Sequence, residues 1–65
     1  MSVLDVRDKE RIEEAVLDNF QTISDVIRDV LFDIIADEFG IMTERFREEA
    51  INEGLKVIER YRDVC

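Results

Sequence analysis

The chain has 65 residues, of which 46% are hydrophobic and 40% charged, and its formal net charge at pH 7 is −8. This length predicts one domain, residues 1–65, and folding of so short a chain buries only about 60% of its unfolded surface. A single cysteine and no histidine exclude a disulfide framework and a metal site built on His or thiolate ligands. We therefore expect self-association or a partner protein to supply part of the stability.

The composition also bears on where the protein works. The longest apolar runs, Val30–Phe32 and Ile34–Ala36, are separated by Asp33 and are too short to cross a membrane. Residues 1–11 are charged where a secretion signal needs an apolar segment. An unpaired cysteine without such a signal is typical of a reducing compartment, so we expect a cytoplasmic protein with no membrane partner.

The first half of the chain has the apolar periodicity of an amphipathic helix. Successive apolar residues after Ile12 are spaced by 4, 4, 3, 4, 3, 1 and 3 positions, namely Val16, Phe20, Ile23, Ile27, Val30, Leu31 and Ile34. This stripe keeps its phase through residues 19–22, where residue propensity alone permits a break. The pattern predicts one long helix over about residues 8–38, with Asp8 as its N-cap.

A short turn over residues 39–43 is predicted next. Gly40 is suited to the left-handed conformation that ends a helix, and Ile41 is the hydrophobic residue that often packs back on such an end. Thr43 is a second N-cap, and it starts a helix over about residues 44–62. Because the connection is short, the two helices are expected to form an antiparallel hairpin in an all-α fold.

The second helix has an apolar face broader than one neighbouring helix can cover. Gly54 lies in the middle of this face, four residues after Ala50, and a glycine there lowers helix propensity by roughly 1 kcal/mol. Close approach of another backbone would offset that loss; the alternative is that Gly54 is simply tolerated. We predict a dimeric four-helix bundle whose interface includes Arg47, Ala50, Ile51, Gly54, Leu55 and Ile58.

The acidity is concentrated in residues 1–38, which contain eleven Asp or Glu against four Lys or Arg. On a continuous helix, five of these carboxylates form a row opposite the apolar stripe: Glu14, Asp18, Asp25, Asp29 and Asp33. This row predicts a docking surface for a basic protein, while the alternative is a solvated face that keeps the protein soluble. Direct binding of nucleic acid through this face is disfavoured by repulsion from phosphate.

Two polar residues flank the predicted turn. Asp37 lies at the edge of the first apolar stripe and Arg47 near the middle of the second. One hypothesis pairs them, within the chain or across a subunit boundary, because buried polar groups usually find partners. The alternative is that Arg47 extends over the apolar rim to water.

No combination of residues predicts an enzyme. Paired carboxylates act as acid and base only in a pocket that perturbs their pKa, and a helical hairpin of this size offers little cavity. Di-metal carboxylate bundles use a Glu-x-x-His pair, which a chain without histidine lacks. We therefore assign no catalytic, metal or cofactor residues and expect a non-enzymatic interaction module.

One stretch resembles a known family. The sequence Ser24-Asp25-Val26-Ile27-Arg28-Asp29-Val30-Leu31 is similar to the second-helix signature S-[ED]-V-I-R-[ED]-x-L of ribbon-helix-helix repressors and antitoxins. The resemblance implies that residues 2–7 form the short ribbon strand, with Val3, Asp5 and Arg7 facing outward to DNA. It also implies dimerisation and an alternative function, a DNA-binding antitoxin whose residues 41–65 wrap a toxin.

Overall fold

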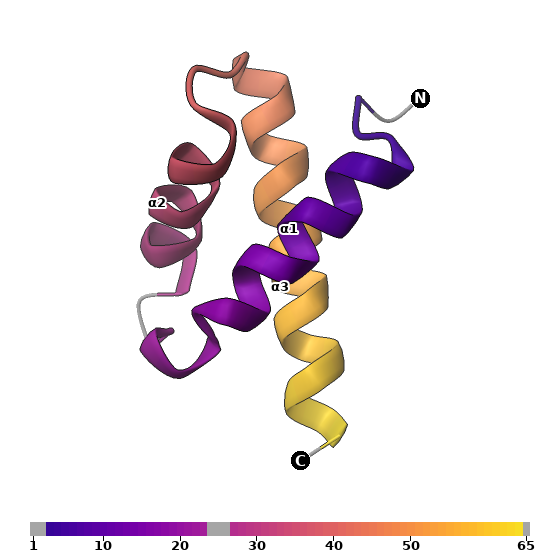
Figure 1. Cartoon of the computed structure of the whole chain (residues 1–65), viewed down its shortest axis with the longest axis vertical. Coiled ribbons are helices and arrows are strands. Elements are labelled where there is room, and N and C mark those ends of the chain that lie inside the picture. The colour runs from indigo at the N-terminus through magenta and orange to yellow at the C-terminus, as the bar shows by residue number, and fades with distance from the viewer. Residues whose placement is uncertain (1–2, 24–26, 65) are drawn as a thin grey trace.

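The computed structural model describes residues 3–23 and 27–64 of the chain. Within them are three α-helices and one short 3-10 helix: α1 (Val6–Asp18), η1 (Phe20–Thr22), α2 (Ile27–Phe39) and α3 (Glu44–Val64). The prediction of an all-α fold is confirmed, and the described residues contain no strand. The helices α2 and α3 form an antiparallel hairpin, and α1 crosses α3 obliquely (Figure 1).

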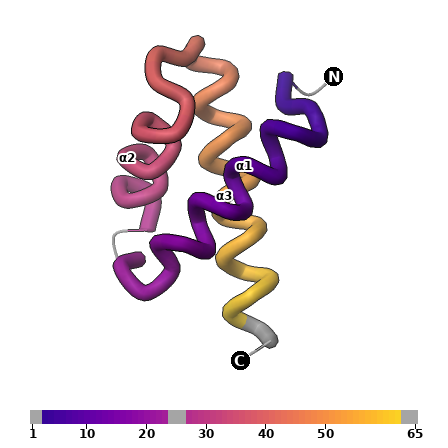
Figure 2. The backbone as a smooth tube through the Cα atoms, viewed as in Figure 1, coloured from indigo at the N-terminus to yellow at the C-terminus, as the bar shows by residue number. Residues whose placement is uncertain are grey.

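The prediction of one long helix over residues 8–38 is wrong. The helix α1 ends at Asp18, η1 follows, and Ile23 is extended with φ −70° and ψ 121°. The amide nitrogen of Asn19 bonds the Val16 carbonyl, and its side-chain amide donates to the Ala15 carbonyl at 2.8 Å. The chain thereby leaves the direction of α1, and α2 runs beside α3 (Figure 2).

Burial explains why the chain breaks here. A continuous helix of this length would measure about 46 Å, whereas the longest dimension of the molecule is 32 Å. The break lets Phe20 and Ile23 pack against the core from the connection itself. Asparagine, phenylalanine and threonine are also modest helix formers, so ending α1 at this point loses little propensity.

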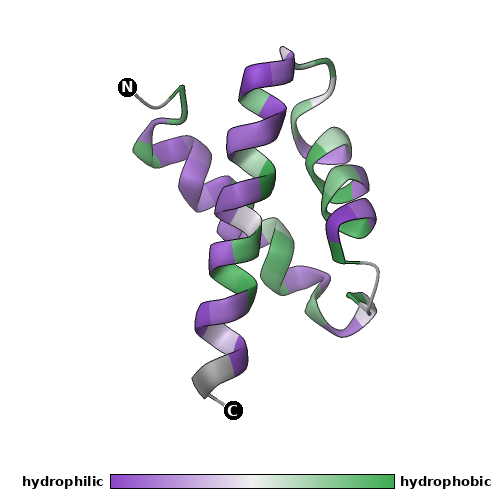
Figure 3. Ribbon diagram, turned by 180° about the vertical axis from the view of Figure 1, so that it is seen from behind, coloured by the Kyte–Doolittle hydropathy of each residue, from purple (hydrophilic) through white to green (hydrophobic). Residues whose placement is uncertain are grey.

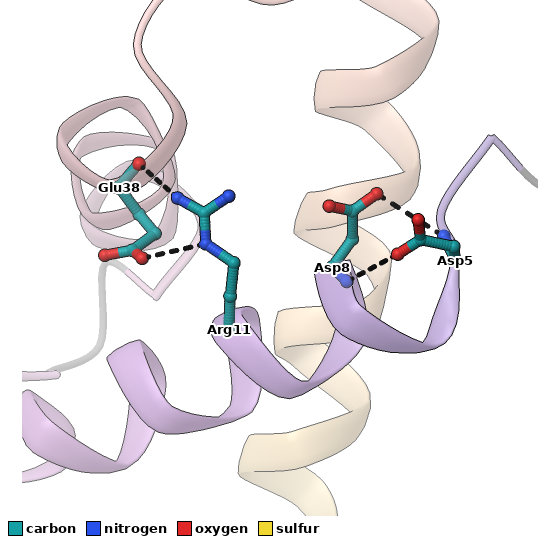
Figure 4. A network of polar contacts seen from close by, with 4 residues as sticks. All are labelled: Asp5, Asp8, Arg11 and Glu38. Carbon is teal, nitrogen blue, oxygen red and sulfur yellow. Dashed lines mark hydrogen bonds and ion pairs between the residues drawn. The ribbon is translucent and has the colours of Figure 1, made fainter.

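The N-terminus of α1 is fixed by a capping box. The Asp5 carboxylate accepts from the Asp8 amide at 2.8 Å, and the Asp8 carboxylate accepts from the Asp5 amide at 3.4 Å. Asp5 is therefore the N-cap and Asp8 the third helical residue, so the prediction of Asp8 as the cap is wrong by one turn (Figure 4). Each carboxylate satisfies an amide that would otherwise lack a helical partner.

The turn between α2 and α3 agrees with the prediction in all but one residue. Gly40 has φ +73°, and its amide bonds the Ala36 carbonyl at 2.8 Å. The Thr43 hydroxyl accepts from the Phe46 amide at 3.2 Å and caps α3. Ile41, expected to pack back, is instead fully exposed at 104%. The single bond from Gly40 defines the αL type of helix end, in which the residue after the glycine is not drawn toward the helix.

The core is made where α1 and α2 both meet α3. Among the described residues, nine hydrophobic ones are buried: Leu4, Ile12, Val16, Leu31, Ile35, Ala50, Ile51, Val57 and Ile58. Seen from behind, hydrophobic and hydrophilic residues alternate along α3, as expected of a helix with one buried side (Figure 3). A Cβ atom built at Gly54 would lie 3.0 Å from the Leu31 Cδ2 atom and 3.6 Å from the Val16 Cγ2 atom. The glycine is thus the point at which side chains of both other helices approach α3.

Each pair of helices is also joined by one ion pair on the surface. The Arg11 and Glu38 side chains connect α1 to α2 at 3.1 Å, and Glu13 and Arg60 connect α1 to α3 at 3.1 Å. A longer pair, Arg28 and Glu48 at 3.9 Å, connects α2 to α3. Exposed pairs of this kind contribute about 0–1 kcal/mol each, so the buried core dominates the stability.

Replacing Gly54 with valine tests the close approach at α3. We expect Gly54→Val to lower the free energy of unfolding by about 1–3 kcal/mol, because the added methyl groups overlap Leu31 and Val16. Urea unfolding followed by circular dichroism measures the change. In a Leu31→Val background, which lacks the Cδ atoms, the loss should be smaller. An equal loss in both backgrounds would contradict the contact with Leu31.

Candidate interaction surfaces

The five carboxylates predicted to form one row lie on two helices. Glu14 and Asp18 are on α1, while Asp29 and Asp33 are on α2, and all four are exposed. Asp25 lies outside the described residues. The row is interrupted because the prediction depended on a single helix axis, which the break after Asp18 removes.

On α2 the acidic row continues one turn further than predicted. Asp29, Asp33 and Asp37 are exposed and spaced by four residues, so their Cβ atoms lie along one side of the helix. None of them takes part in the ion pairs formed among the described residues. Glu38, by contrast, is neutralised by Arg11. The outer side of α2 is therefore a line of three uncompensated negative charges, which we call the acidic row of α2.

An exposed aromatic side chain borders the acidic row of α2. Phe32 is 40% exposed and lies within one helical turn of Asp29 and Asp33. The guanidinium carbon of Arg47, from α3, lies 5.4 Å from the centre of the Phe32 ring. In the described part of the chain, Arg47 and Asp37 form no ion pair, so the intrachain form of that hypothesis is wrong. The aromatic ring, within cation–π distance, is the partner that Arg47 uses.

The predicted oligomer residues lie mainly inside the chain. Ala50 and Ile58 are 0% and 3% exposed, and Ile51 is 6% exposed. Gly54 is buried beneath Leu31, as described above. Only Leu55 and Arg47 of that set retain intermediate exposure. The reason is the broken first helix: two helices, rather than one, cover the broad face of α3.

A second surface lies at the end of the hairpin and is organised by Arg11. Its Nε atom is 3.1 Å from the Glu38 carboxylate, and an Nη atom donates to the Glu38 carbonyl at 2.9 Å (Figure 4). The same guanidinium lies 4.3 Å from the centre of the Phe39 ring. The Phe39 ring meets the Phe46 ring edge to face, with 5.2 Å between centroids. Arg11 thus holds the last turn of α2 and the base of the hairpin turn together.

Next to these rings is an open hollow of about 220 Å³, lined by Phe39, Ile41, Met42, Thr43 and Phe46. We call this region the turn surface. Its lining is mostly apolar, and much of the connection from α2 to α3 is hydrophobic in Figure 3. Ile41 stands out from it as the most exposed large hydrophobic residue in the described part of the chain.

Further hollows are present on the surface of the described residues. The larger ones are lined by Leu4, Lys9, Glu49, Asn52, Glu53 and Lys56, and by Ile27, Leu55, Ile58, Glu59 and Arg62. Across residues 3–23 and 27–64, no three metal-ligating side chains are grouped to hold an ion. In the same residues, no helix is both long and apolar enough to cross a membrane.

The signature that resembles ribbon-helix-helix proteins is helical in its described part. Ile27–Leu31 begin α2, and Ser24–Val26 lie outside the described residues. The ribbon strand implied over residues 2–7 is not formed in its described part, since Asp5 caps α1 and Arg7 is helical. Comparison with known proteins found no match, either to a protein-family model, to a curated protein or to a solved structure.

The role of Arg11 is open to a direct test. Arg11→Lys keeps the charge but loses the planar group that contacts Phe39, one carboxylate oxygen of Glu38 and the Glu38 backbone carbonyl. We expect the free energy of unfolding to fall by about 1 kcal/mol, as typical for a lost charge-assisted hydrogen bond with partial exposure. The matched control, Arg28→Lys, alters a looser pair and should change stability by less than about 0.5 kcal/mol. If thermal unfolding shows that the two substitutions lower stability equally, Arg11 and Glu38 form only an ordinary surface ion pair.

Proposed function

We propose that this protein is a small, acidic, non-enzymatic interaction module that docks a basic segment of a partner protein on α2. The supporting observation is the acidic row of α2: Asp29, Asp33 and Asp37 are exposed and take part in none of the described ion pairs. A single cysteine in the chain is consistent with a cytoplasmic setting.

The placement of charge favours a binding role over simple solvation. Like charges spaced by four residues destabilise a helix by roughly 0.2–0.5 kcal/mol per pair. A soluble surface is better served by interspersed charges of both signs. Glu13, Glu38 and Glu49 follow that pattern, since each contacts an arginine. The acidic row of α2 departs from it, as do the exposed Glu10, Glu14 and Asp18 of α1, which also lie four residues apart and take part in none of the described ion pairs.

Phe32 adds the apolar component that a docking surface needs. Charged contacts at the rim of an interface contribute mainly to association rate and specificity, while buried aromatic residues supply most of the affinity. Phe32 lies beside the row with 40% of its surface exposed. A partner helix with lysine or arginine at four-residue spacing would align its cations with the three carboxylates and cover the ring.

Direct titration tests the proposal. The probe is a fluorescent, helix-forming peptide with lysine at every fourth position, and the readout is anisotropy at low and physiological salt. We expect binding that weakens with salt, because exposed charges are screened. The variant Asp29→Asn, Asp33→Asn, Asp37→Asn should lose about 10-fold in affinity, since each exposed pair contributes about 0.2–1 kcal/mol.

A second triple variant controls for net charge. Glu10→Gln, Glu44→Gln, Glu59→Gln removes the same charge from exposed positions elsewhere and should change affinity by less than about 2-fold. A double variant, Glu14→Gln with Asp18→Asn, tests the part of the predicted row that lies on α1. Equal weakening by both triple variants would mean that the peptide responds only to overall charge. Tight binding of a specific DNA duplex instead of the peptide would favour the antitoxin alternative.

A further inference from the structure

We propose that the turn surface is a self-association site, at which Ile41 of one copy enters the hollow of a second copy. The first observation is the exposure of Ile41, which is 104%. Single exposed hydrophobic residues are common on protein surfaces, but Ile41 adjoins an apolar hollow, and contiguous exposed apolar surface is typical of interaction sites.

The second observation is that protrusion and hollow lie on the same surface. The open hollow measures about 220 Å³, and Ile41 itself is one of the residues that line it, together with Phe39 and Phe46. Apolar cavities of about 150 Å³ are large enough to hold benzene, so a branched aliphatic side chain fits this volume. A two-fold axis between copies requires such self-complementarity, because each copy then offers the same knob and the same hollow.

Charge identifies the second copy as the occupant. Two chains with a net charge of −8 repel one another over most of their surfaces. Residues 37–47 contain three carboxylates (Asp37, Glu38, Glu44) and two guanidinium groups (Arg45, Arg47), and Arg11 adds a third guanidinium at this end. Residues 37–47 therefore carry a net charge of −1, and −7 of the total of −8 lies on the rest of the chain.

The same charges argue against an anionic lipid surface as the occupant. An apolar tip on a hairpin turn also resembles a membrane-inserting loop. Anionic headgroups attract basic segments, however, and the excess negative charge of this chain opposes their approach. The low net charge of residues 37–47 suits contact with an identical hairpin end, because little charge repulsion there opposes the apolar contact.

Sedimentation equilibrium over a wide range of protein concentration tests the proposal. We expect reversible dimerisation that becomes tighter with added sodium chloride. Salt screens the repulsion between the two copies, whose surfaces outside the hairpin end are acidic. Ile41→Ser should weaken dimerisation at least about 10-fold, as removal of a buried hydrophobic anchor does at other interfaces. Since Ile41 is fully exposed in the single chain, the variant should keep the wild-type circular dichroism spectrum, and its melting temperature should not change at concentrations at which both proteins are monomeric.

The matched control is Val6→Ser, which removes a hydrophobic side chain that is 73% exposed at the start of α1. It should leave dimerisation unchanged. In a mixture of labelled and unlabelled copies, isotope-filtered NMR should show contacts between the Ile41 methyl groups and the Phe39 or Phe46 ring of the other copy. Such contacts support the proposal.

Three results would overturn it. One is a wild-type protein that stays monomeric at millimolar concentration. Another is a dimer that Ile41→Ser does not weaken. The third is binding of the monomer to phosphatidylcholine vesicles through Ile41, which would assign the turn surface to lipid. None of these measurements involves Asp29, Asp33 or the lysine peptide, so the result is independent of the proposed docking function.

Discussion

Contact at Gly54 is the packing constraint on which the rest of the structure depends. With no side chain at this position, Leu31 from α2 and Val16 from α1 both reach the middle of α3. One helix thus serves as the common partner of the other two, and its broad apolar face is covered within a single chain. The radius of gyration, 11.0 Å, is close to the value of about 10.7 Å expected for a compact domain of this length.

This packing changes what a second copy would contribute. The sequence led us to expect that oligomerisation completes the core, with Ala50 and Gly54 at the subunit boundary. Both are instead buried by α1 and α2. Of the large apolar residues left exposed among the described ones, Phe32 and Ile41 are on the periphery of the hairpin, and Val3, Val6 and Leu17 are on or beside α1. Association through these residues would join chains that each already have a complete hydrophobic core. Such association is typical of weaker, reversible interfaces.

The sequence predicted which residues face the core better than it predicted the path of the chain. Ile12, Val16 and Leu31 belong to the predicted stripe and are buried. On α2, however, the core holds Ile35, which the stripe did not include, and does not hold the predicted Val30 and Ile34. Periodicity along one assumed axis reports the side on which residues lie, and it does not show that the helix is interrupted. The low helix propensity of residues 19–22 was the available signal for the break. What decided it was the tertiary burial of Phe20 and Ile23, which local sequence does not contain.

The prediction of the acidic row was affected by the same error, the assumption of one continuous helix over residues 8–38. Asp29 and Asp33 remain an exposed pair because both lie within α2, whereas their alignment with Glu14 assumed a continuous axis. Asp37 was considered only as a partner for Arg47, although its four-residue spacing from Asp33 placed it in the acidic row of α2. The contact of Arg47 with Phe32 depends on how α3 lies against α2, so no spacing within one helix predicts it.

The hairpin turn depends on chirality rather than on size. Gly40 has φ +73°, and a Cβ atom added there would meet nothing within 4 Å. An L-alanine at this position would have ample room and still be strained, since L-residues disfavour the left-handed region. The mirror-image residue has the opposite preference, and D-alanine would occupy the same space while restricting the unfolded backbone more than glycine does. The glycine is thus required by the handedness of the amino acids, in a place where packing would accept almost any side chain.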